Sequence, residues 1–170
     1  MGAAAKPPAA TDIDTWSPEK IAKACRPVLI YYYCNPITDA ENPNWAFARK
    51  LEMLCFARKD VVDLLTGQFA CEKVSVKYEL ETKRGKPVVE EGAKPVATRW
   101  DYRVTKVVLA SFDGEKRFTE LSAKQANSPH LKSANFTKLL QNVLAANAKY
   151  IKDLQKQAAK DRVAAAKKGA

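Results

Sequence analysis

The sequence predicts an α/β domain with a central mixed sheet, flanking helices and a long basic helix at the C-terminal end. A continuous apolar run rich in β-forming residues predicts a strand that is buried on both faces. Segments with helical spacing separate it from further strand-like segments, which is the alternation of an α/β fold. The 170 residues, 46% of them hydrophobic, suffice for one such domain.

A short helix and the central strand are expected first. Ser17 and Pro18 suit the cap and first turn of a helix that extends to Ala24. Arg26-Pro27 ends it, and the apolar run from Val28 to Tyr33 is predicted to be the central strand. We expect its three tyrosines in the core, because an RNA-stacking sheet needs aromatic residues at alternate positions among Gly, Lys and Arg.

A loop and two helices should follow this strand. Polar and turn-forming residues from Cys34 to Asn44 predict an exposed loop, and a helix is expected from about Trp45. Asp60 should open a second short helix that Thr66-Gly67 ends. Apolar residues of the first helix recur at helical spacing and are expected to be buried: Phe47, Leu51, Leu54 and Cys55.

Three more strands and a long helix are expected in the second half. Phe69 to Tyr78 should form a half-buried strand, and residues 79–98 an inserted loop or hairpin. Asp113-Gly114 predicts a tight turn between antiparallel strands. Ser133-Ala134-Asn135 should cap a helix beginning at Phe136. Its apolar stripe should lie against the sheet: Leu140, Val143, Leu144, Ile151 and Leu154.

These elements predict three parts of the chain. Residues 1–14 should be a flexible leader, 15–154 the folded domain and 155–170 a basic helical tail with no core to join. The leader lacks the apolar run of a signal peptide, and no segment approaches the roughly 18 apolar residues of a membrane span. We therefore expect a cytoplasmic protein without a membrane span.

The charge balance favours anionic partners. The formal net charge is +10, from 29 Lys and Arg against 19 Asp and Glu. The C-terminal segment holds Asp153 and Asp161 but seven basic residues, which are Lys149, Lys152, Lys156, Lys160, Arg162, Lys167 and Lys168. This candidate anion-binding tail suits nucleic acid, although a helix end that only increases solubility is an equally good interpretation.

The cysteines and the single histidine argue against most metal and thiol chemistry. No two cysteines have the C-x-x-C spacing of redox or zinc sites, and Cys25, Cys55 and Cys71 are expected to be buried free thiols. Cys34 follows the central strand and is the candidate for a single-cysteine thiol enzyme, although no basic residue follows it within five positions. His130 is expected to face solvent. We expect no metal ion and no other cofactor.

The order of elements resembles the thioredoxin superfamily over about residues 26–144. This resemblance implies a three-layer fold in which helices flank a mixed sheet. Four stretches carry it: Arg26-Pro27-Val28-Leu29-Ile30-Tyr31, which is similar to the first core strand; Arg49-Lys50-Leu51-Glu52 with Phe56 and Val61, similar to the kinked active-site helix of short members; Phe69-Ala70-Cys71-Glu72-Lys73-Val74, similar to the next strand; and Tyr102-Arg103-Val104-Thr105 with Asp113-Gly114, similar to the approach to the last hairpin.

The family's catalytic residues are not carried over. Alignment puts Trp45 and Ala48, or in a shifted register Asn42 and Trp45, where the resemblance implies the paired cysteines. Lys106-Val107-Val108 stand where the cis-proline would be. The sequence therefore predicts a non-enzymatic binding or assembly module that joins protein partners in a larger complex. Its expected contact residues are Asn35, Asp39, Asn42, Asn44 and Trp45.

Overall fold

A five-stranded mixed sheet forms the centre of the protein. The computed structural model describes residues 18–34, 43–78, 87–89, 105–122 and 128–169. The strand order is β3-β2-β1-β4-β5. β1 pairs in parallel with β2, and every other pair is antiparallel. The strands are β1 (Val28–Cys34), β2 (Ala70–Tyr78), β3 (Pro87–Val89), β4 (Lys106–Ala110) and β5 (Arg117–Ser122). The predicted α/β class with a mixed sheet is confirmed.

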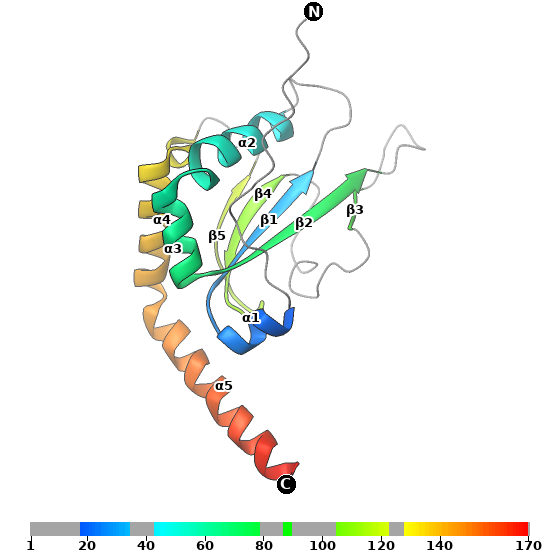
Figure 1. The fold of residues 1–170 in the computed structure, drawn as a ribbon, viewed down its shortest axis with the longest axis vertical. Coiled ribbons are helices and arrows are strands. Elements are labelled where there is room, and N and C mark those ends of the chain that lie inside the picture. Colours follow the sequence, from blue (N-terminus) through cyan, green and yellow to red (C-terminus); the bar gives the residue numbers. More distant parts are fainter. Residues whose placement is uncertain (1–17, 35–42, 79–86, 90–104, 123–127, 170) are drawn as a thin grey trace, which may run out of the picture.

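Helices cover one face of this sheet and then extend past it. The helices are α1 (Pro18–Ala24), α2 (Pro43–Leu51), the π-helical η1 (Glu52–Phe56), α3 (Lys59–Gln68), the 3-10 turn η4 (Pro129–Leu131), α4 (Ser133–Ala146) and α5 (Ala148–Lys168). Figure 1 shows α2, α3 and α4 together on one side of the sheet, while α5 continues beyond α4 to the end of the molecule where α1 lies. The β3 strand pairs with β2, so part of the predicted insertion is a hairpin strand.

The central strand is buried on both faces, as its apolar sequence predicts. Leu29 and Tyr31 belong to the core between the sheet and the helices. Tyr31 makes an edge-to-face contact with Phe56, whose ring in turn meets Phe136, at centroid distances of 5.3 and 5.9 Å. Such pairs add about 0.5–1.5 kcal/mol beyond the area they bury. Tyr32 is also fully buried, on the other face, so the core interpretation holds for both tyrosines.

The second face of the sheet carries charge as well as apolar side chains. Ile30 and Val108 are buried there beside Glu72 and Lys106, and Lys106 is only 3% exposed. The Lys106 ammonium lies 5.5 Å from the centre of the Tyr32 ring. Burial, followed by the nearby carboxylates, raises the pKa of Tyr32. This face therefore combines a buried cation with a neutral tyrosine.

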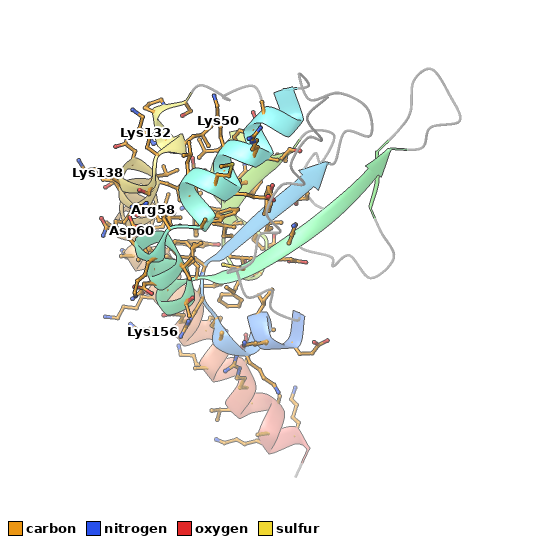
Figure 2. All side chains as sticks on the ribbon, turned by 45° about the horizontal axis from the view of Figure 1, so that its top comes forward. Lys50, Arg58, Asp60, Lys132, Lys138 and Lys156 are labelled. Carbon is orange, nitrogen blue, oxygen red and sulfur yellow. The ribbon has the colours of Figure 1, made fainter. Side chains whose placement is uncertain are left out.

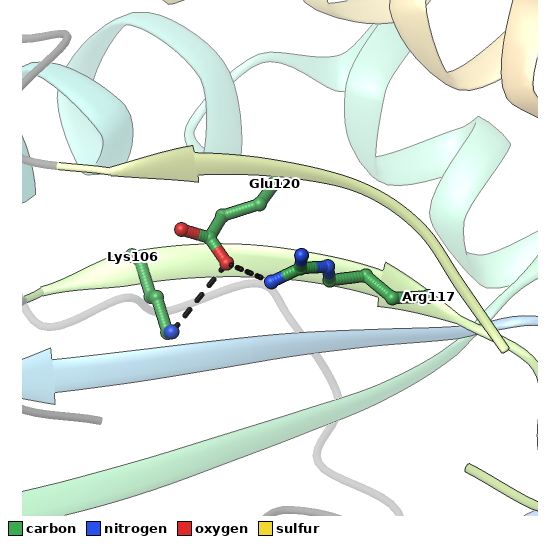
Figure 3. A network of polar contacts seen from close by, with 3 residues as sticks. All are labelled: Lys106, Arg117 and Glu120. Carbon is green, nitrogen blue, oxygen red and sulfur yellow. Dashed lines mark hydrogen bonds and ion pairs between the residues drawn. The ribbon is translucent and has the colours of Figure 1, made fainter. Parts of the chain in front are cut away.

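A β-bulge organises the charges at the edge of this face. Arg117 and Glu120 are three residues apart, so an undistorted strand would place them on opposite faces. The register between β4 and β5 shifts at Leu109/Ala110, which puts Arg117 opposite Ala110 and Glu120 opposite Val108. Glu120 Oε2 then accepts from Arg117 Nη1 at 2.9 Å and from Lys106 Nζ at 3.5 Å (Figure 3).

The turn between β4 and β5 and the start of α4 follow local sequence signals. Gly114 has φ 73°, a left-handed conformation that glycine adopts without strain, and the predicted Asp113-Gly114 turn is confirmed. α4 begins at Ser133, three residues earlier than predicted, and Asn147 separates it from α5. The long predicted helix is therefore two helices.

α5 has no buried residue, so the segment after Leu154 joins no core, but two of its side chains contact the end of α1. Gln155 Nε2 donates to the Cys25 carbonyl at 2.9 Å, and Arg162 Nη2 donates to the carbonyls of Ala22 and Lys23 at 2.8 Å each. The Ala22 and Lys23 carbonyls lie in the last turn of α1, where a helix has no backbone N–H of its own to offer them, and Cys25 follows directly after the helix. Side chains of α5 thus cap the C-terminus of α1.

Replacing Phe136 with alanine tests the aromatic core. Phe136 is fully buried and contacts Phe56, so the substitution should lower the free energy of unfolding by about 3–5 kcal/mol. Urea denaturation followed by circular dichroism measures this loss. Replacing its exposed neighbour Ala134 with serine should change stability by less than about 1 kcal/mol. Equal effects of the two substitutions would contradict this description of the core.

Candidate functional site

The candidate site lies on the helix that follows β1, where α2 continues into η1. Cys34 is the last residue of β1 and pairs in register with Val76. Asn44 and Trp45 stand in the first turn of α2. Three other expected contact residues lie outside the described residues: Asn35, Asp39 and Asn42. The structure thus places the backbone of two of the five expected contact residues at the start of α2.

The three cysteines whose side chains the structure describes are buried. Ala48 of α2 stands at one of the positions where the resemblance implies a cysteine, and its side chain is buried. Cys25, Cys55 and Cys71 are free and buried, which confirms that part of the prediction. Burial and, less strongly, the charge of Asp60 raise the pKa of Cys55 to about 12. A thiol in that environment stays protonated and unreactive.

The π-helical turn η1 carries two exposed apolar residues, one of which the sequence predicts to be buried. The Ala57 N–H donates to the Glu52 carbonyl at 2.9 Å, a hydrogen bond across five residues that accommodates one extra residue in the turn. Glu52, Cys55 and Phe56 therefore face inward. Met53 and Leu54 are each 45% exposed, so the predicted burial of Leu54 is wrong.

The inward carboxyl of Glu52 anchors this turn to the sheet. Glu52 Oε1 accepts from the Tyr31 hydroxyl at 3.0 Å, and the Lys73 ammonium lies 5.7 Å from the centre of the Tyr31 ring. Burial raises the pKa of Glu52, although the Tyr31 hydrogen bond and the charge of Lys73 both act to lower it. Desolvation is the largest of these effects. The π turn thus satisfies a tyrosine hydroxyl within the core.

Basic residues border the exposed apolar pair. Lys50 precedes Met53 and Leu54 by three and four residues, which places it beside them on the helix surface. Arg58 follows directly after the turn and is exposed. Figure 2 shows Lys50 and Arg58 on the outer side of the helix layer, with Lys132 and Lys138 of the neighbouring segment on the same side. We name Lys50, Met53, Leu54 and Arg58 the η1 surface.

The histidine lies nearer the core than the sequence predicts. His130 belongs to η4 and is partly buried, so the solvent-facing prediction is wrong. Its Nδ1 is buried and has no hydrogen-bond partner within the described ranges. Its carbonyl oxygen lies 3.9 Å from the Cys55 sulfur, which places η4 against η1.

The basic tail residues do not act as one group. All seven lie on α5, but Arg162 faces α1, where it contacts two carbonyls and, at 3.1 Å, the Cys25 sulfur. The lysines are exposed: Lys149, Lys152, Lys156, Lys160, Lys167 and Lys168. Composition identified the positive charge of this segment, but only the structure separates the docking residue from the exposed ones.

Comparisons with other proteins add no identification. No family model matches the chain, and neither a curated protein nor a solved structure matches it. Among the residues that the structure describes, no cluster of three or more His, Cys, Asp and Glu side chains could hold a metal ion. Within the same residues, no helix combines the length and apolar character needed to cross a membrane.

Substituting Glu52 with glutamine should change how stability depends on pH. Since the folded pKa of Glu52 is raised, its contribution to stability is fully present below the unfolded pKa of about 4.3 and is lost as pH rises through the folded pKa. Glu52→Gln removes this loss. The stability difference, variant minus wild type, should therefore increase with pH in this window by at most about 1.4 kcal/mol per pH unit. Urea midpoints measured from pH 4 to 8 give this difference, and parallel profiles would refute it.

Cys55 should resist alkylation in the folded protein. With its pKa raised to about 12, the thiolate fraction at pH 8 should make reaction with iodoacetamide roughly a thousandfold slower than for an unperturbed cysteine. Peptide mass spectrometry follows the modification, and the same protein in urea provides the reference rate. Similar rates in the folded and unfolded protein would contradict the described burial.

Proposed function

We propose that the protein is a redox-inactive thioredoxin-like module that binds a protein partner within a larger complex. The parallel β1–β2 pair joined to the antiparallel β4–β5 hairpin supports the thioredoxin-like part, because the resemblance implies that combination. The helix after β1 also breaks at Arg58, whose backbone is extended, and resumes as α3 at Lys59. This break supports the similarity to the kinked helix of short family members.

The positions of the cysteines support the redox-inactive part. α2 contains no cysteine, and a buried alanine occupies one of the two positions that the resemblance assigns to the catalytic pair. Cys25, Cys55 and Cys71 have buried thiols. Free thiols also suit a reducing compartment, and the proposal accordingly places the protein in the cytoplasm.

The η1 surface is the observation that carries the binding part. Leu54 is displaced from the predicted buried stripe and is exposed beside Met53, and apolar side chains remain exposed at a cost unless a partner covers them. π turns also occur often at functional sites. Asn44 and Trp45, which the proposal keeps as contact residues, stand in the first turn of the same helix, about 12 Å along its axis.

The charge of the η1 surface determines the kind of partner. Lys50 and Arg58 flank the apolar pair, and further lysines lie on the same side of the helix layer. An acidic protein segment with two or three apolar side chains complements both properties, because its carboxylates would face the basic residues around a covered apolar centre. We therefore propose such a segment as the occupant.

Affinity capture with matched variants tests this function. Tagged wild-type protein, Met53→Gln/Leu54→Gln and Val163→Gln are used to capture partners from nuclease-treated native lysate. Val163 is an exposed apolar residue of α5, 56% accessible, and serves as the control. The η1 variant should lose a partner that wild type and Val163→Gln retain. A synthetic acidic segment of that partner should then bind wild type at least tenfold more tightly than the η1 variant, and less tightly as salt increases.

Two results would overturn the proposal. Equal capture by all three proteins would show that the η1 surface makes no contact. A Cys34 thiol pKa well below the ordinary value of about 8.5, together with catalysed thiol exchange that Cys34→Ser abolishes, would instead establish the single-cysteine enzyme.

A further inference from the structure

One face of α5 contacts the C-terminal end of α1. Gln155 and Arg162 are seven residues apart, close to two helical turns, so they lie on the same side of α5. Both donate hydrogen bonds to the C-terminal end of α1. Ile151, one further turn before Gln155, is partly buried on this side. These contacts fix which side of α5 faces solvent.

Five exposed lysines form a row on another side of α5. At 100° per residue they fall within an arc of about 80°, whose centre lies roughly 120° around the helix from Arg162. They are Lys149, Lys152, Lys156, Lys160 and Lys167, which we name the lysine row. The row spans 18 residues, about 27 Å. Asp153 borders it, whereas Asp161 lies farther round and accepts a hydrogen bond from Gln157.

We propose that the lysine row binds the phosphate backbone of duplex nucleic acid. A straight row of cations about 27 Å long matches the length of roughly eight base pairs, at 3.4 Å for each phosphate of a strand. Each lysine can lie against phosphate oxygens and release a condensed counterion. The row thus provides the electrostatic contact that supports binding to any base sequence.

The composition of the row disfavours other anionic partners. A helix that lies on a membrane needs large apolar side chains opposite its cations. In α5, Ile151 and Leu154 are partly buried, and Val163 is the one large apolar residue that is exposed. No aromatic residue lies in the row, so it cannot stack bases of single strands. A single line of five cations along one side of a straight helix suits a line of phosphates better than an irregular acidic protein surface.

The docked face should strengthen this binding without contacting the ligand. Gln155 and Arg162 hold α5 in place, so less freedom is lost when the row binds. Lys168 is also exposed but lies about 120° around the helix from the centre of the row. Position on the helix, rather than the count of positive charges, therefore determines which residues bind.

Salt-dependent binding to a random-sequence 20-base-pair duplex tests the proposal in the full-length protein. Fluorescence anisotropy should give a slope of log K against log salt between about −4 and −5, since each of five lysines contributes about −0.9. Lys156→Gln/Lys160→Gln should reduce the slope by about 2 and weaken binding at least tenfold at low salt. Lys132→Gln/Lys138→Gln removes the same charge from exposed residues near the helix layer (Figure 2) and should change affinity less than threefold.

Several outcomes would overturn the proposal. The first is equal loss of affinity in the two double variants, since binding would then follow net charge alone. The second is polyglutamate binding as tightly as the duplex with the same dependence on the row, which would assign the row to an acidic protein. Absence of duplex binding at low salt is the third. Circular dichroism confirms folding, and Met53→Gln/Leu54→Gln should bind the duplex like wild type, which separates this test from that of the η1 surface.

Discussion

The hydroxyl of Tyr31 sits on the central strand beneath the helix layer, where water cannot satisfy it. A buried hydroxyl without a partner costs about 1–3 kcal/mol, so the helix above must supply an acceptor. Glu52 does so, and its side chain faces inward at a position where the neighbouring residues Leu51, Cys55 and Phe56 are also inward. These four inward side chains share one face of the helix, and Met53 and Leu54 lie outside that face and are exposed.

The strands were predictable because their signals are local. The apolar run of β1 and the Asp113-Gly114 turn each depend on neighbouring residues, and the structure places both as expected. The π turn was not predictable in this way. Under a regular helical period Leu54 belongs to the buried stripe, whereas the structure exposes Leu54 and buries Glu52, which accepts a hydrogen bond from Tyr31, 21 residues away. The missed site thus originates in a long-range contact.

The same distinction applies to the basic segment. Its composition predicted positive charge, and the helical period could have sorted its lysines by face, but nothing nearby in sequence shows which face is free. Arg162 seemed equivalent to the lysines because only residues of α1 distinguish it. His130 was misplaced for a related reason, since packing between η4 and η1 decides its environment. A site that depends on which face of a helix is exposed can thus be recognised only from the tertiary structure.

The contact between α5 and α1 also affects the order in which parts of the chain can fold during synthesis. Arg162 is 140 residues away from Ala22 along the chain, yet it caps the helix to which Ala22 belongs. Ribosomes deliver the N-terminal segment first, at about 5–20 residues per second, so α1 leaves the exit tunnel several seconds before Arg162 exists. Until then, the Ala22 carbonyl can accept from the nearby Cys25 thiol, as it does in the folded protein at 3.2 Å, but the hydrogen bonds from Arg162 are missing. The C-terminal end of α1 is therefore completed only after the chain has been synthesised at least as far as Arg162.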